Sequence, residues 1–111
     1  MAKYVYPAIF VKEDVGYSVT FPDLEGCFSA GETLPEAMEM AADALCLVLY
    51  NKEKSGEIIP PASNVKQVQA ETDADVSLVF CDTVEYYKFY ESTASTPITL
   101  LRFSPLKKVT D

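Results

Sequence analysis

The chain has 111 residues, of which 49% are hydrophobic, 12% aromatic and 23% charged, a composition typical of one globular domain with a single core. Its 9 Lys and Arg residues against 17 Asp and Glu residues give a net charge of −8, which disfavours nucleic acid as a direct ligand and favours a basic protein partner. The chain has no histidine, which excludes imidazole-activated nucleophiles and His-ligated metal sites within it.

The cysteines and the hydropathy pattern indicate the cellular compartment. Cys27, Cys46 and Cys81 are widely spaced and form no C-x-x-C pair, so we interpret them as reduced thiols that pack as small hydrophobic residues. No stretch approaches the roughly 20 consecutive apolar residues of a membrane helix, and the N-terminus lacks the pattern of a secretory signal. We therefore expect a cytoplasmic protein that does not contact a membrane.

The first third of the chain predicts three antiparallel strands. Residues 3–12 are rich in β-branched and aromatic side chains, and apolar residues alternate with polar ones over 16–21. Turn-forming residues between these runs predict a hairpin, and residues 27–30 predict a third, short strand. Pro7 has no amide to donate, so we expect it at a bulge or facing away from the neighbouring strand.

A long helix should follow, from about Leu34 to Ser55. Thr33 and Glu36 fit a capping box, in which the Thr33 hydroxyl accepts from the Glu36 amide and the Glu36 carboxylate accepts from the Thr33 amide. Gly56 is a natural stop. Apolar residues recur at spacings of three and four, which is the pattern of a helix packed on a sheet: Leu34, Ala37, Met38, Ala41, Leu45, Val48 and Leu49.

The segment after the helix predicts a linker and a fourth strand. Residues 57–75 contain two adjacent prolines and end in ETDAD, so we expect a surface connection. The apolar run 76–81 is too short for a helix and predicts a buried strand, which can return parallel to an earlier strand by a right-handed crossover. The predicted fold class is therefore α+β, in which residues 1–82 form one domain of order β-β-β-α-β with one main helix on one face of the sheet.

Residues 83–111 are predicted to form a C-terminal extension. Residues 83–91 suit either a short helix or a strand extension, and residues 97–103 resemble a short strand. The first of these segments is too aromatic for a bare surface helix, so we expect it to support a homo-oligomer. The predicted oligomerisation residues are Tyr86, Tyr87, Phe89 and Tyr90.

Carboxylates are the only plentiful catalytic residue type, so a metal-dependent nuclease is the enzyme hypothesis to test. It fits poorly, because the first strand contains no carboxylate and the nearby acids fall in turns or at strand edges. The glycines are scattered, which argues against a phosphate-binding loop. We predict no catalytic residue, no metal site and no cofactor.

Three motifs, in this order and spacing, resemble the HicB antitoxin family. They are YPAIF at residues 6–10, GYSVTFPDLEGC at 16–27 and GETLPEA at 31–37, and IPPAS at 59–63 follows. The resemblance implies a partial ribonuclease-H-like fold without catalytic carboxylates, and an antitoxin that binds and neutralises a HicA-like mRNA-cleaving toxin. Family members commonly continue into a segment that binds their own promoter, but too few residues follow Ser92 for a reading helix, so specific DNA binding is not expected.

Two other functions remain open on the sequence alone. The chain could be a stand-alone HicB-like protein-interaction module, or a weak nucleic-acid-binding protein with strongly salt-dependent affinity. For the antitoxin reading, we expect the toxin to dock at turns next to the sheet edge, where acids surround one aromatic anchor. The predicted contact residues are Asp23, Glu25 and Glu32 around Phe28.

Overall fold

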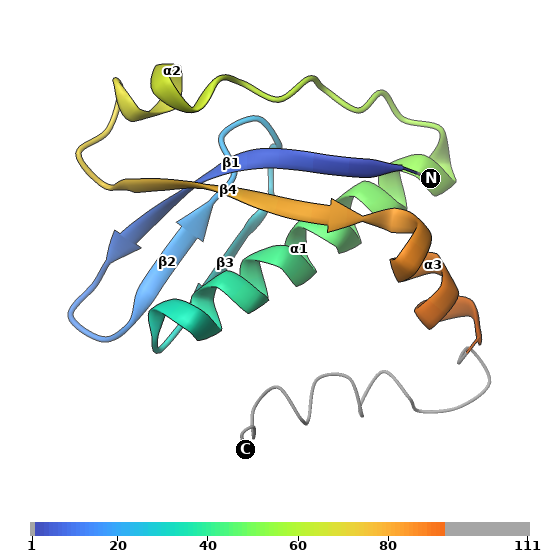
Figure 1. Cartoon of the computed structure of the whole chain (residues 1–111), viewed down its shortest axis with the longest axis horizontal. Coiled ribbons are helices and arrows are strands. Elements are labelled where there is room, and N and C mark those ends of the chain that lie inside the picture. Colours follow the sequence, from blue (N-terminus) through green and yellow to red (C-terminus); the bar gives the residue numbers. More distant parts are fainter. Residues whose placement is uncertain (1, 93–111) are drawn as a thin grey trace.

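Four strands form one antiparallel sheet, and a long helix packs across one face of it (Figure 1). The computed structural model describes residues 2–92. The strand order is β3-β2-β1-β4, so β3 and β4 are the two edges. The strands are β1 (Lys3–Lys12), β2 (Tyr17–Thr20), β3 (Phe28–Gly31) and β4 (Asp75–Asp82), and the helices are α1 (Leu34–Ser55), α2 (Val65–Gln69) and α3 (Thr83–Ser92).

The predicted α+β class, the order of the strands along the chain and the limits of the main helix are confirmed. The choice between helix and strand for residues 83–91 is settled in favour of the helix α3. The strand predicted over residues 97–103 lies outside the described residues.

The direction of β4 differs from the prediction. β4 is antiparallel to β1, with a continuous register from Lys3 opposite Asp82 to Phe10 opposite Asp75, so the parallel crossover is wrong. The reason lies in residues 56–74. α1 carries the chain to one end of the sheet, and this segment then runs back to the other end before β4 begins (Figure 1). Between β3 and β4 the chain therefore runs the length of the sheet twice, once as α1 and once as residues 56–74. A single helical crossover would have made β4 parallel to β3, and the second passage reverses its direction.

The core lies between α1 and the even-numbered residues of β1. Tyr6, Ala8 and Phe10 are at most 3% exposed. They belong to one cluster with the buried side of α1. Tyr50, which the predicted stripe does not include, is also buried on this helix. Leu34 was expected in that stripe but is 47% exposed, because it lies in the first turn at the end of the helix. The buried stripe consists of Ala37, Ala41, Leu45 and Leu49.

Local side-chain chemistry sets both ends of α1. The Thr33 hydroxyl accepts from the Glu36 amide at 3.2 Å, as predicted. The Glu36 carboxylate accepts at 2.8 Å from the amide of Glu32 rather than from that of Thr33, so the reciprocal half of the predicted box is wrong by one residue. At the other end, Gly56 takes a left-handed conformation with φ of 74°, which a residue with a Cβ rarely adopts.

The first turn of α1 presses against the end of β3. A Cβ on Gly31 would lie 2.4 Å from the backbone nitrogen of Ala37 and 2.6 Å from its Cα. Ala37 is fully buried against the sheet, so the helix cannot withdraw without opening the core. Glycine at this position therefore sets how closely α1 approaches the sheet.

Pro7 sits inside β1 without losing a strand hydrogen bond. The Thr83 amide donates to the Ala2 carbonyl at 2.9 Å, so Ala2 and Thr83 are a hydrogen-bonded pair. Because such pairs alternate along an antiparallel ladder, the backbone groups of the even-numbered residues of β1 bond to β4. The nitrogen of Pro7 faces the other side, where β2 pairs with β1 only from Ile9 onwards. This agrees with the expectation that Pro7 faces away from its neighbouring strand.

The sequence predicts a surface linker over residues 57–75, and the structure ties this segment to the sheet. The Tyr6 hydroxyl donates to the Pro60 carbonyl, and Ser63 donates to Asp23 in the turn after β2. The short helix α2 lies within this segment and buries Val68, which is 6% exposed. The segment therefore fixes the path that reverses β4.

A hydrogen-bond network at Glu53 joins three elements. Its Oε2 accepts from the Tyr4 hydroxyl at 2.7 Å and from the Thr83 hydroxyl at 3.1 Å, which links α1, β1 and the start of α3. Thr83 is fully buried and also bonds the Ala2 backbone. Burial alone raises the pKa of Glu53, but the hydrogen bonds, including those from Tyr4 and Thr83, outweigh it and hold the pKa below its usual value. Burial and the bond to Glu53 raise the pKa of Tyr4 to about 12.

We expect Glu53→Gln to lower the free energy of unfolding by roughly 1–2 kcal/mol at neutral pH, because the charged acceptor is lost. The folded-state pKa of Glu53 is lowered, so its contribution is present above the unfolded value of about 4.3 and fades as the pH falls through the folded value. Urea unfolding of both proteins at neutral and strongly acidic pH measures this. The control is Glu39→Gln, an exposed carboxylate on α1. A wild-type advantage that grows in acid contradicts the assignment.

Gly31→Ala should destabilise the fold by about 2–4 kcal/mol, because the new methyl group meets helix backbone that cannot move. Gly56→Ala has nothing within 4 Å of the new Cβ and should cost only the strain of its positive φ, about 1 kcal/mol. Thermal unfolding of the two variants, followed by circular dichroism, gives the comparison. Equal losses would show that the contact between β3 and α1 is not tight.

Candidate functional site

The face of the sheet opposite α1 carries exposed hydrophobic side chains. Val5 and Phe80 lie opposite each other in the register between β1 and β4, and they are 44% and 55% exposed. Leu78, which is 55% exposed, is opposite Pro7, and Val11 lies further along β1. Residues an even number apart on a strand share a face, so these side chains lie on one surface.

Phe28 extends this surface to the opposite edge of the sheet. Thr20 of β2 pairs with Phe28 on one side and with Ile9 on the other, and Ile9 shares the face of Val5. Phe28 is 69% exposed. The exposed apolar side chains of this face lie on β1, β3 and β4, and the polar Thr20 of β2 stands between Phe28 and β1. Exposed apolar side chains gathered on one face are typical of a protein-binding surface. We call it the outer face and define it by Val5, Val11, Phe28, Leu78 and Phe80.

Of the outer face, the sequence prediction included only Phe28. A signal for the rest is present in KYVYPAIFVK, where apolar residues occupy both faces of β1 rather than alternating with polar ones. A sheet with one solvated face normally alternates, so apolar residues at both parities indicate that something covers the second face. The same holds for Leu78 and Phe80 in β4.

Two of the predicted acidic contacts lie beside the outer face. Glu25 is exposed in the turn before β3, and Glu32 is exposed directly after it. Together they place a carboxylate near each end of the strand that carries Phe28. The structure therefore brings together three of the four predicted residues around one edge of the sheet.

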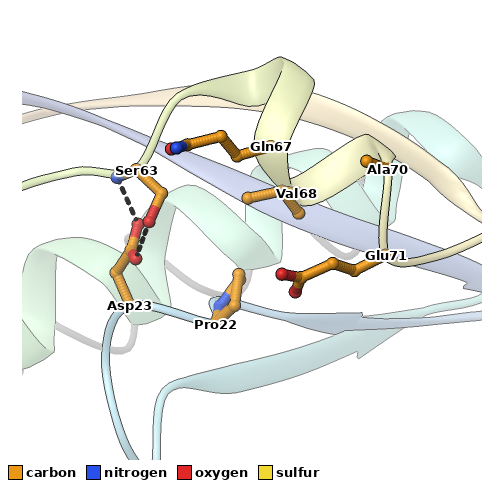
Figure 2. A pocket seen from close by; sticks show the side chains of 7 residues that line it. All are labelled: Pro22, Asp23, Ser63, Gln67, Val68, Ala70 and Glu71. Carbon is orange, nitrogen blue, oxygen red and sulfur yellow. Dashed lines mark hydrogen bonds between the residues drawn. The ribbon is translucent and has the colours of Figure 1, made fainter.

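The fourth predicted residue, Asp23, serves a different contact. Figure 2 shows its carboxylate turned to Ser63, whose amide and hydroxyl donate to it at 2.8 Å and 2.5 Å. The pair borders a cleft of about 530 Å³ between the turn after β2 and α2, next to Val68 and Glu71 (Figure 2). Asp23 is half-buried, and the role that the geometry gives it is to hold the returning segment against the sheet. Sequence reasoning could not find this, because Asp23 and Ser63 are 40 residues apart.

The aromatic residues of α3 pack partly within the chain. The rings of Tyr86 and Tyr87 lie 5.2 Å and 4.6 Å from the ring of Tyr50 on α1, edge to face. The ammonium group of Lys54 lies over the rings of Tyr50 and Tyr87. These contacts anchor α3 to α1. The side chains of Phe89 and Tyr90 lie outside the described part, and the role of all four residues in oligomerisation stays a prediction.

Two features are absent from residues 2–92, the part of the chain that the structure describes. Within this range, no three His, Cys, Asp or Glu side chains come together as a metal-binding group. None of the helices described there is both long and apolar enough to span a membrane.

Comparisons with known proteins identify the family. The HicB-like antitoxin family of bacterial toxin–antitoxin systems matches residues 6–109. An uncharacterized 14.9 kDa protein of Haemophilus phage HP1 is 38% identical over 63 residues, which are 57% of this chain and 47% of that protein. Antitoxin HicB 2 of Photorhabdus laumondii is 31% identical over 72 residues, 65% of this chain and 52% of that protein. The chain thus spans about half the length of these curated relatives.

A solved structure shares the fold. A chain of the HicA3 and HicB3 toxin–antitoxin complex superposes with a TM-score of 0.59 and 25% identity, over 71% of this chain and 99% of that one. The fold and the sequence motifs therefore point to the same group of proteins. The chain belongs to the HicB-like antitoxin family of bacterial toxin–antitoxin systems.

Proposed function

We propose that this chain is an antitoxin that binds a HicA-like mRNA-cleaving toxin and neutralises it. The observation that carries the proposal is the outer face, an apolar surface of the sheet beside exposed carboxylates. Family membership supports it, and so does the likeness to a chain of a solved HicA3 and HicB3 complex. The net charge of −8 favours a basic partner.

The two parts of this surface would do different work. Desolvated apolar side chains at the centre of an interface supply most of the affinity, and Phe80, Leu78 and Val5 have the exposed area to do so. Carboxylates at the rim speed association with a basic partner and exclude wrong ones. Glu25 and Glu32 would take that role around Phe28.

Neutralisation in this proposal needs no chemistry from the antitoxin. A ribonuclease must hold phosphates with basic groups, and carboxylates such as Glu25 and Glu32 can pair with the same groups. An occupied toxin surface then cannot bind RNA. We infer a non-enzymatic, stoichiometric inhibitor, and the membership in an antitoxin family agrees with such a regulatory role.

Phe80→Arg should weaken binding of a HicA-like toxin by at least about 100-fold, because it places a positive charge on the outer face against a basic partner. The control is Leu47→Arg, a change at a 45% exposed apolar residue of α1, which packs on the opposite face of the sheet, and it should leave affinity within about threefold. The toxin would come from the reading frame next to this gene. Calorimetry gives the affinity, and an RNA-cleavage assay gives the inhibition. Equal losses in both variants, or none in Phe80→Arg, would refute the surface.

Reversing the charge of Glu25 and Glu32 together to Lys should slow association by roughly tenfold at low salt, with a difference that shrinks as salt rises. Reversing Glu39 and Glu85 together to Lys, both at exposed helix positions, changes the net charge by the same +4 and is the matched control, which should alter the rate less. Stopped-flow mixing at several salt concentrations separates the two. If the control slows association as much, the acids act only through the net charge of the chain.

A further inference from the structure

Two cysteines that are far apart in the sequence meet at the centre of the fold. The sulfur of Cys46, in the middle of α1, lies 2.6 Å from the sulfur of Cys81 in β4, although the two residues are 35 positions apart. Cys81 is 1% exposed on the core side of the sheet, and Cys46 is half-buried. The sequence alone indicates three separate cysteines that pack as small hydrophobic residues, and for this pair the structure shows a contact that spacing along the chain cannot indicate.

We propose that Cys46 and Cys81 are a thiol pair which a peroxide oxidises to an intramolecular disulfide that ties α1 to β4. Neither Cys46 nor Cys81 is part of a disulfide in the structure, and their sulfur atoms are in contact. Disulfide formation requires two sulfur atoms that can approach without moving the backbone, and this contact fulfils that requirement. The proposal does not depend on the identity of any protein partner.

The oxidation takes place in two balanced steps. The Cys46 thiol first gives up its proton, and the thiolate attacks one oxygen of hydrogen peroxide. The O–O bond breaks, the leaving hydroxide takes up that proton as water, and Cys46 becomes a sulfenic acid. The sulfur of Cys81 then attacks the sulfur of Cys46, the S–O bond breaks, and the hydroxyl leaves with the thiol proton as a second water. The two thiols lose two electrons and two protons, and one peroxide is reduced to two waters.

The surroundings of the two thiols assign their order of reaction. Cys46 is the more accessible sulfur, whereas Cys81 is enclosed by the core. The hydrogen bond with Cys46, followed by burial, raises the pKa of Cys81 and keeps it protonated. Cys46 is therefore the residue that meets the peroxide, and Cys81 is the one that resolves the sulfenic acid.

The bond would secure the edge strand that carries part of the outer face. β4 holds Leu78 and Phe80, and along the chain residues 56–74 separate it from α1. A disulfide between residues 35 apart would remove conformational freedom from the unfolded chain and should raise the melting temperature on the order of 10 °C.

The test uses the full chain, reduced, freed of reductant and then treated with hydrogen peroxide. Labelling with a maleimide in denaturant should modify one of the three cysteines, and peptide mapping should find Cys46 linked to Cys81. The matched control is Cys27→Ala. It removes the cysteine that is not part of the pair, so no thiol should remain to be labelled after oxidation. In Cys46→Ala, both remaining thiols should be labelled, and oxidation should not raise the melting temperature.

The wild-type readout does not depend on whether the variants fold. The proposal is overturned if the protein is folded during the peroxide treatment and all three thiols are then labelled in denaturant. It is also overturned by a disulfide that includes Cys27 or by one that joins two chains. Reversal of both the mass change and the thermal shift by a dithiol reductant would support it. Toxin binding can be measured on the same reduced samples, so a failure of the disulfide leaves the antitoxin proposal unaffected.

Discussion

The pairing of β1 with a neighbour on each side is the constraint on which the rest of the structure depends. β2 pairs along its second half, and β4 pairs along most of its length. With both edges of the strand engaged, its side chains can only alternate between the two faces. Tyr6, Ala8 and Phe10 then build the core with α1, while Val5 and Val11 project to the outer face. One strand thus supplies both the stability of the fold and its candidate binding surface.

The sequence predicts those features of the fold that depend on residues close to one another along the chain. α1 begins and ends where predicted because Thr33 and Gly56 act on backbone groups within one turn of themselves. The first hairpin likewise depends on the turn residues that lie directly between its two strands. The direction of β4 was out of reach, because it depends on how residues 56–74 cross the sheet, and that path is held by tertiary contacts such as the one between Asp23 and Ser63.

The candidate site shows the same division. The acids and Phe28 could be proposed from the sequence because turns and aromatic residues can be recognised one at a time. The outer face as a surface was missed, because it exists only once β4 is aligned with β1 and places Phe80 opposite Val5. Asp23 shows the converse, since an acid in a turn that would suit a partner is instead used to hold the chain's own return path.

The register between β1 and β4 also has a consequence for synthesis of the protein. Lys3 pairs with Asp82, so the two partners are 82 − 3 = 79 positions apart along the chain. On a ribosome, the edge of β1 that β4 later covers stays open until nearly all of the described domain has been made. Such non-local pairings fold slowly, and an open strand edge invites pairing with other chains in the meantime. The nascent chain is therefore most exposed to misassembly in the interval before β4 emerges.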